Sequence, residues 1–214
     1  MDGRTARARA TRARVVAAAT GLFTAAGYAA TSVEAIATTA GVGVQTVYYA
    51  FGTKRAILTE ALDHAVAGDD EPVPTLQRSW ARATLDEPDP IKQLHRQVAG
   101  AADIYERAAP LLDVVRSAAA TDPDLAEAWR TNLDQRRTVQ HAFTTALATK
   151  TPLTAGLDID RAADIVLAVL SPEIYLLLVQ IRSWSTDQWQ QWATNALIQQ
   201  LTALRPGLSN VRCS

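Results

Sequence analysis

The sequence predicts an all-α protein of about nine helices. Three observations support this class: alanine is abundant, apolar residues recur with helical spacing, and no long stretch alternates with a period of two. Glycine and proline fall at the ends of the periodic segments, where helices stop and start. The chain has 214 residues, 48% of them hydrophobic, which is enough for one large core or two smaller ones.

The first two helices are expected on either side of Gly27, which can adopt positive φ at the end of a helix. One face of the first helix is formed by five apolar residues with helical spacing: Val15, Ala19, Leu22, Phe23 and Ala26. The second helix is predicted to begin with a capping box made by Thr31 and Glu34. Gly41 then ends it.

A third short helix is predicted over about 44–50, followed by Gly52 and by Thr53 as the N-cap of a fourth helix that reaches about Val66. The glycine- and proline-rich segment 68–74 then predicts a boundary between an N-terminal domain, 1–67, and a C-terminal domain, 68–214. The fourth helix would connect them.

The C-terminal domain is expected to contain helices over roughly 75–85, 90–106, 108–120, 123–149, 160–183 and 185–204. Pro90 at the first position and a capping box at Ser185 and Gln188 predict two of the helix starts. Pro172 should kink or split the apolar helix 160–183. The apolar part of that helix, from Ile165 to Ile181, is shorter than the ~20 apolar residues of a membrane span and contains Glu173, so we expect no membrane insertion.

Charge separates the two predicted domains. Residues 1–67 carry seven basic and four acidic side chains, a net +3, whereas 68–214 carry 14 basic and 18 acidic ones, a net −4. A basic end, with an Arg-rich start, indicates contact with a polyanion such as nucleic acid, although a solvated basic tail is the plainer alternative.

No motif of an enzyme is present. The three histidines lie far apart without metal-ligand spacing, and the chain lacks a nucleophile elbow, a P-loop and a dinucleotide-binding glycine motif. We therefore expect no catalytic residue, no metal and no cofactor. The single cysteine, Cys213, excludes a disulfide framework, and the start lacks an apolar signal segment, so a cytoplasmic location is expected.

Residues of about 32–51 have the size and layout of a helix-turn-helix centred on Gly41. Helical spacing directs Val47 and Phe51 to the core and directs Gln45 and Tyr49 away from it, flanked by Thr46 and Tyr48. A glutamine amide can pair with adenine in the major groove, and hydroxyl groups suit phosphate oxygens. This acid-free polar face indicates DNA binding.

Residues 10–62 resemble the DNA-binding domain of the TetR family of transcriptional regulators, through GYAATSVEAIA at 27–37 and AGVGVQTVYYAFGTK at 40–54. The resemblance implies phosphate contacts by Thr31 or Ser32, Thr46, Tyr48 and Lys54, and base contacts by Val44, Gln45 and Tyr49. Gly43 and Ala50 depart from the family's usual serine and histidine, which could alter operator preference.

The resemblance also implies a homodimer on an inverted-repeat operator in double-stranded DNA, paired through roughly 160–183 and 185–204. The last of these helices places six apolar residues on one broad face: Trp189, Trp192, Ala196, Leu197, Leu201 and Leu204. The alternative is that this face is internal core.

A small-molecule effector is expected inside the C-terminal helices, and aromatic residues there favour an aromatic or lipophilic compound. The candidate lining residues, each of which could instead be ordinary core or surface, are Trp80, His95, Tyr105, Arg116, Trp129, His141, Phe143, Glu173 and Tyr175. The expected function is thus that of a ligand-responsive repressor. The alternatives are a ligand-independent regulator or activator, and then a helical scaffold or an enzyme.

Overall fold

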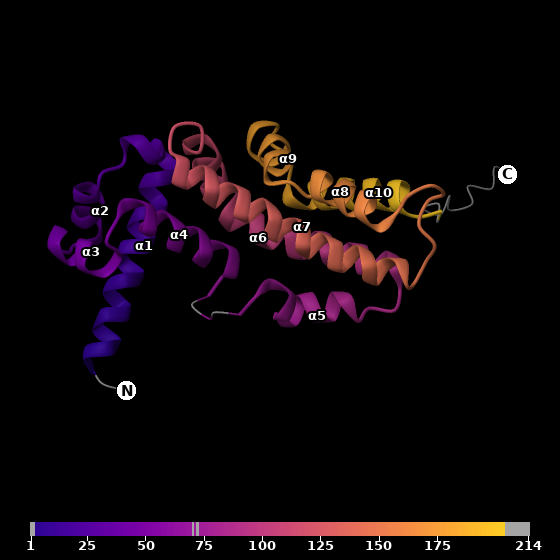
Figure 1. The fold of residues 1–214 in the computed structure, drawn as a ribbon, viewed down its shortest axis with the longest axis horizontal. Coiled ribbons are helices and arrows are strands. Elements are labelled where there is room, and N and C mark those ends of the chain that lie inside the picture. The colour runs from indigo at the N-terminus through magenta and orange to yellow at the C-terminus, as the bar shows by residue number, and fades with distance from the viewer. Residues whose placement is uncertain (1–2, 70, 72, 204–214) are drawn as a thin grey trace. The chain divides into compact units, whose positions relative to one another are not determined.

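The computed structural model describes residues 3–69, 71 and 73–203, whose helices are drawn in Figure 1. These residues form no strand beyond an isolated bridge between Leu153 and Thr202, so the predicted all-α class is confirmed. In chain order the elements are α1 (Gly3–Ala30), α2 (Val33–Ala40), α3 (Val44–Phe51), α4 (Lys54–Ala67), the 3-10 helix η1 (Thr75–Gln77), α5 (Ser79–Leu85), α6 (Pro90–Ala118), α7 (Pro123–Ala148), α8 (Ile159–Val169), α9 (Pro172–Tyr175), the π-helix η2 (Leu176–Ile181) and α10 (Thr186–Leu201).

The chain divides into two compact units, and α6 and α7 contribute to both. The first unit comprises Met1–Glu71 and Arg107–Thr131, and the second comprises Pro72–Glu106 and Asn132–Ser214. The first unit therefore contains α1–α4, the end of α6 and the start of α7. The boundary between residues 67 and 68 stays a prediction, because compact packing does not show which segments fold independently.

The core of the first unit forms where α1 packs against α2 and α4, and α2 against α3. Four large, fully buried side chains of α1, α2 and α4 each contribute about 1.5–3 kcal/mol by leaving water: Phe23, Ile36, Ile57 and Leu58. Ala26, predicted on the buried face of α1, is exposed. Gly27, the next residue, has a φ of 80°, so helical geometry breaks there.

Most of the predicted helix caps are present. The Ala56 N–H donates to Thr53 Oγ1 at 3.1 Å, and Ser185 and Gln188 form the predicted capping box. The box predicted at Thr31 is wrong, because Ser32 is the N-cap of α2 and its Oγ accepts from the Ala35 N–H. The Thr31 hydroxyl instead donates back to the Gly27 carbonyl at 2.8 Å.

The two helices predicted over 90–106 and 108–120 are one helix, α6, which continues through Pro110. Proline inside a helix costs about 3 kcal/mol because it lacks an N–H and its ring crowds the preceding turn. Residues on both sides of Pro110 are fully buried, including Leu111 and Leu112. Their burial outweighs the cost of the proline, so the helix does not end.

The apolar stretch predicted as one helix over 160–183 is split at Pro172, as its proline predicts. Leu170 ends α8, and Ser171 caps α9 by accepting from the Ile174 N–H. By length and composition alone, Ile159–Ile181 could cross a membrane, which is weak evidence because core helices of soluble proteins pass the same test. The break at Ser171 and Pro172 interrupts this stretch.

The core of the second unit includes the contact between α8 and α10. Trp189, Leu197 and Leu201 are fully buried within the chain itself. The predicted dimer face of α10 is therefore largely internal core, because its broadest apolar side faces α8. Trp192 and Ala196 are half-buried, and Leu204 lies outside the described residues.

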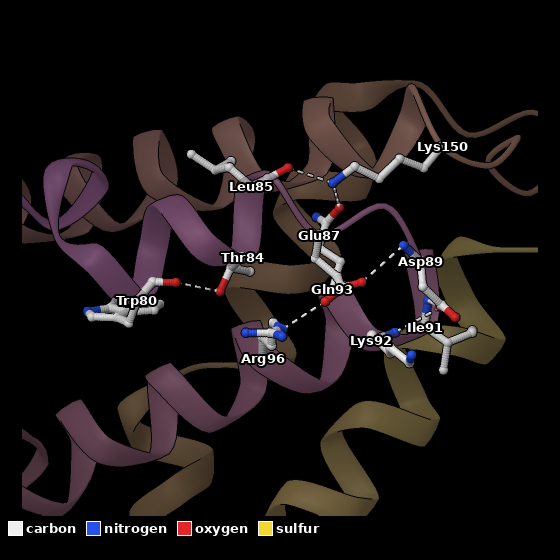
Figure 2. A network of polar contacts seen from close by, with 10 residues as sticks. All are labelled: Trp80, Thr84, Leu85, Glu87, Asp89, Ile91, Lys92, Gln93, Arg96 and Lys150. Atoms are coloured by element: carbon white, nitrogen blue, oxygen red, sulfur yellow. Dashed lines mark hydrogen bonds and ion pairs between the residues drawn. The ribbon is translucent and has the colours of Figure 1, made fainter.

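A polar network ties α5, α6 and α7 together within the second unit (Figure 2). Lys150 Nζ donates to the Leu85 carbonyl at 2.7 Å and to Gln93 Oε1 at 2.6 Å. The buried Gln93 amide then donates to the Phe143 carbonyl at 2.8 Å. Burial lowers the pKa of Lys150, and the carboxylates of Asp86 and Glu87 oppose that shift.

Candidate nucleic-acid interface

A glycine turn orients α3 relative to α2. Gly41 has a φ of 66°, and its N–H donates to the carbonyls of Ala37 and Thr38. Only a residue without a Cβ enters this left-handed conformation readily, so Gly41 stops α2 and lets the chain reverse. Gly43 is the N-cap of α3 and gives no side-chain cap, as predicted.

The buried side of α3 determines which residues it presents to solvent. Val47 and Phe51 are buried, so Gln45, Thr46, Tyr48 and Tyr49 face outward, while Val44 is half-buried. Tyr49 is 95% exposed and Tyr48 is 43% exposed. The helix contains no acidic residue, so this side offers an amide, a hydroxyl and two phenols without charge that would repel a phosphate.

Arg12 holds the C-terminal end of α3, a role that the sequence did not reveal. Its Nη1 donates to the Ala50 carbonyl at 2.7 Å, and its guanidinium lies 4.4 Å from the centroid of the Phe51 ring. It also forms a two-pronged ion pair with Glu60 of α4. The charge pattern predicted that Arg12 belongs to a free basic arm. In the structure it instead links α1, α3 and α4.

Lys54 and Thr31 close the junction between α1 and α2. Lys54 Nζ donates to the carbonyls of Tyr28 at 2.8 Å and Thr31 at 2.9 Å, and lies 4.2 Å from the Tyr28 ring centroid. Thr31 is only 3% exposed, and its hydroxyl donates to Gly27 and Leu22. Of the predicted pair, Ser32 is thus the residue that faces solvent, because Thr31 is turned into the junction.

The helix α4 is attached at both ends to the segments of α6 and α7 in the first unit. Arg55, in its first turn, pairs with Asp124 of α7. Arg107 Nε of α6 donates to the Ala65 carbonyl in its last turn at 3.1 Å. Two polar contacts therefore set the position of α4 within the unit that carries α3.

Four of the predicted pocket residues form two aromatic contacts. Tyr105 and Tyr175 contact each other, with ring centroids 5.7 Å apart, and Trp80 contacts Phe143 at 6.0 Å. His141 is half-buried, with Nε2 3.7 Å from the Asp160 carboxylate, while His95 and Glu173 are exposed. Arg116, which pairs with Asp113, and Trp129 belong to the first unit, whereas the other predicted pocket residues belong to the second.

Trp189, which was not among the predicted pocket residues, contacts two of them. Its ring centroid lies 5.1 Å from that of Tyr175 and 6.2 Å from that of Tyr105. The sequence showed only that it lies on the apolar side of its helix. Within the described part of the chain, no cluster of three or more histidine, cysteine or acidic side chains could hold a metal ion, and Cys213 lies outside that part.

Residues 15–61 match the model of the bacterial regulatory proteins of the tetR family. This match covers most of α1, all of α2 and α3, and the first half of α4. No curated protein matches the chain.

Solved structures of TetR-family regulators share the fold of the whole chain. A transcriptional regulator from Mesorhizobium loti is 22% identical, with a TM-score of 0.67, covering 92% of this chain and 96% of that one. One from Chloroflexus aurantiacus is 21% identical, with a TM-score of 0.67 and coverage of 91% and 98%. NalD of Pseudomonas aeruginosa, the secondary repressor of the MexAB-OprM multidrug efflux pump, is 20% identical, with a TM-score of 0.67 and coverage of 92% and 98%.

These structural similarities establish a shared fold. The family match identifies the DNA-binding helices within it. Members of this family are DNA-binding regulators, so the family match confirms the expectation that the chain is not an enzyme. Residues 15–61 therefore match the DNA-binding domain of the TetR family, and the chain shares the fold of TetR-family regulators.

Proposed function

We propose that this chain is a ligand-responsive transcriptional repressor that binds an inverted-repeat operator as a homodimer and is released by a small effector. The observation that carries the proposal is the outer side of α3, where Tyr49 is 95% exposed and no acid is present. A large side chain gains no burial free energy in that position, which favours a role in contact with another molecule.

The DNA contacts divide by chemistry. Val44, Gln45 and Tyr49 would meet base edges in the major groove, whereas Ser32, Thr46 and Tyr48 would hold phosphates. Lys54 has three N–H donors, of which two bind the carbonyls of Tyr28 and Thr31. The third remains for a phosphate. Lys54 would therefore both hold the junction between α1 and α2 and neutralise a phosphate of the DNA.

A homodimer through η2 and α10 gives the two-fold symmetry that an inverted repeat requires. On η2, Ile181 is 70% exposed and Leu177 is also exposed, although both are apolar. Trp184 and Trp192 lie edge to face, with centroids 6.4 Å apart, and each keeps part of its surface exposed. These residues supply the dimer surface in place of the buried Trp189, Leu197 and Leu201.

The repressor role is supported by NalD, which shares the fold and represses a drug efflux pump. An aromatic or lipophilic effector fits the buried rings of the second unit. The alternative is a ligand-independent regulator or an activator with the same DNA contacts. A DNA-binding regulator of this kind works in the cytoplasm.

The first experiment selects bound sequences from random duplexes with the full-length chain and follows binding by fluorescence anisotropy. We expect an inverted repeat, bound by a dimer with an affinity that falls as salt rises. No enrichment at low salt by folded protein would contradict DNA binding.

Three variants then test the face of α3 and its neighbour. Tyr48→Phe and Lys54→Ala should weaken binding to all sequences, and Lys54→Ala should lower the salt slope by about one. Gln45→Ala should change the selected sequence. Gln135→Ala, an exposed change on α7, serves as the matched control. Unchanged affinity and selection in all three variants would rule out this face.

A further inference from the structure

Three aromatic side chains from α6, α9 and α10 meet in the interior of the second unit. Tyr105, Tyr175 and Trp189, here called the aromatic cluster, have ring centroids 5.1–6.2 Å apart. All three are buried, and Trp189 is fully so. The cluster is therefore part of the interior of the second unit.

The indole N–H of Trp189 is an unsatisfied donor in this cluster. Nε1 is buried and has no hydrogen-bond partner among the described residues. Leaving a buried donor unpaired costs about 1–3 kcal/mol, and buried tryptophans usually find an acceptor. The Tyr105 hydroxyl, by contrast, donates to the Leu170 carbonyl. The cluster thus has one donor to offer to an acceptor from outside the chain.

A cation adjoins the same cluster. Burial raises the pKa of Tyr105 to about 12, while the charge of Arg136 and a hydrogen bond from it act in the opposite direction. Arg136 is half-buried, and its Nε donates to Asn132 Oδ1 at 3.0 Å. A guanidinium carries five N–H donors in one plane, which matches the two oxygens of a carboxylate.

The chain around the cluster departs from regular α-helix at two places. Leu170 is the last residue before the break between α8 and α9, and Tyr175 directly precedes the π-helix η2. Such π-helical turns are rare and are frequent at functional sites.

We propose that the effector of this chain is a small aromatic carboxylate held at the aromatic cluster. Its ring packs against Tyr105 and Tyr175, and its carboxylate accepts hydrogen bonds from Trp189 Nε1 and from the Arg136 guanidinium. The inference rests on the proposed function and names the effector class. A neutral aromatic compound would satisfy the indole N–H but would not use the cation.

The test measures the melting temperature and the binding heat of the full-length chain with benzoate, 2-naphthoate and indole-3-carboxylate, each beside its neutral primary amide. A ligand that binds the folded state raises the melting temperature by mass action. We expect at least one carboxylate to do so more than its amide. No shift with any carboxylate, or equal shifts with carboxylate and amide, would overturn the proposal.

Two variants locate the site. Arg136→Gln should weaken carboxylate binding about tenfold or more and leave amide binding unchanged, because it removes a charge-assisted hydrogen bond. Its control is Arg137→Gln, next in the chain, where an exposed guanidinium pairs with Asp160 and Asp164 instead. Equal loss in both variants, or none in Arg136→Gln, would contradict the site.

Trp189→Phe keeps a ring and removes the N–H, so it should weaken binding of carboxylate and amide alike. Trp184→Phe, outside the cluster, is its control and should leave binding unchanged. Circular dichroism checks that Trp189→Phe is folded. If it is not, the Arg136→Gln variant alone tests whether the carboxylate binds at the aromatic cluster. Full binding by folded Trp189→Phe would refute the donor role of Trp189.

Failure of this inference is distinguishable from failure of the proposed function. Operator selection needs no effector, so an enriched operator without carboxylate binding would overturn the effector class alone. Carboxylate binding at the aromatic cluster without operator enrichment would contradict the proposed repressor function and support the proposed binding site.

Discussion

The two units of the chain use aromatic side chains in opposite ways. In the first unit, Tyr49 projects from α3 into solvent, and its direction follows from the burial of Val47 and Phe51 on the same helix. In the second, Tyr105 and Trp189 meet in the interior although they are far apart in the sequence. A surface for DNA can be built on one helix, whereas an interior site needs several helices to converge.

The largest expected effect is a difference in the free energy of unfolding between variants of Trp189 and of Tyr49. Trp189→Ala should lower the free energy of unfolding by about 3–5 kcal/mol, because it leaves a cavity in the core of the second unit. Tyr49→Ala should change it by less than about 0.5 kcal/mol, because its ring is solvated. Urea unfolding of both variants measures this difference, and equal losses would contradict it.

Two glycines within regular helices also contrast an interior position of the second unit with an exposed position of the first. A Cβ at Gly100 of α6 would overlap the Trp80 ring, so Gly100→Ala should cost about 1–3 kcal/mol. Gly21 of α1 has open space around it, so Gly21→Ala should stabilise by about 0.5–1 kcal/mol. Thermal unfolding of the two variants should show shifts of opposite sign. A stable Gly100→Ala would mean that Trp80 can move aside.

Arg12 connects stability and DNA binding in the first unit. Arg12→Ala should cost about 1–2 kcal/mol, since it removes a charged hydrogen bond to Ala50, the contact with the Phe51 ring and a partly exposed ion pair. Operator affinity should fall as well, because the end of α3 loses its support. Arg14→Ala, an exposed neighbour, is the control for a charge effect alone. Equal losses of affinity would place Arg12 in the basic arm after all.

A pH dependence is expected in the second unit. Burial raises the pKa of Tyr105 to about 12, so the unfolded chain loses this proton at lower pH than the folded one. The stabilisation is therefore present below pH 10 and is lost as the pH rises to about 12. Titration of the tyrosinate absorbance should show a late phase that Tyr105→Phe removes. An unchanged late phase would assign it to another tyrosine.

Local chemistry made most of the first unit predictable. Gly27, Gly41 and Thr53 end or begin helices through their own φ angles or side chains, and each does so in the structure. The prediction failed at Thr31, because two adjacent hydroxyl residues could both cap α2. The choice of Ser32 depends on α1, whose Gly27 carbonyl accepts the Thr31 hydroxyl.

Predictions were weaker in the second unit because packing overrides local preference there. Pro110 would end a solvated helix, yet α6 continues because the leucines that follow the proline are buried. Helical spacing placed Trp189 on the apolar side of α10 but could not say which surface covers it. The structure covers it with Tyr105 and Tyr175.

The sequence by itself determined the all-α class, the helix-turn-helix and the outward face of α3, because helical periodicity and caps act within a few residues. Only the tertiary structure decided that Arg12 supports α3 from α1, that Lys54 closes a junction, and that Trp189 belongs to an interior cluster. Those roles depend on contacts between residues 14 to 84 positions apart. Such contacts form when helices pack, and periodicity along one helix does not specify them.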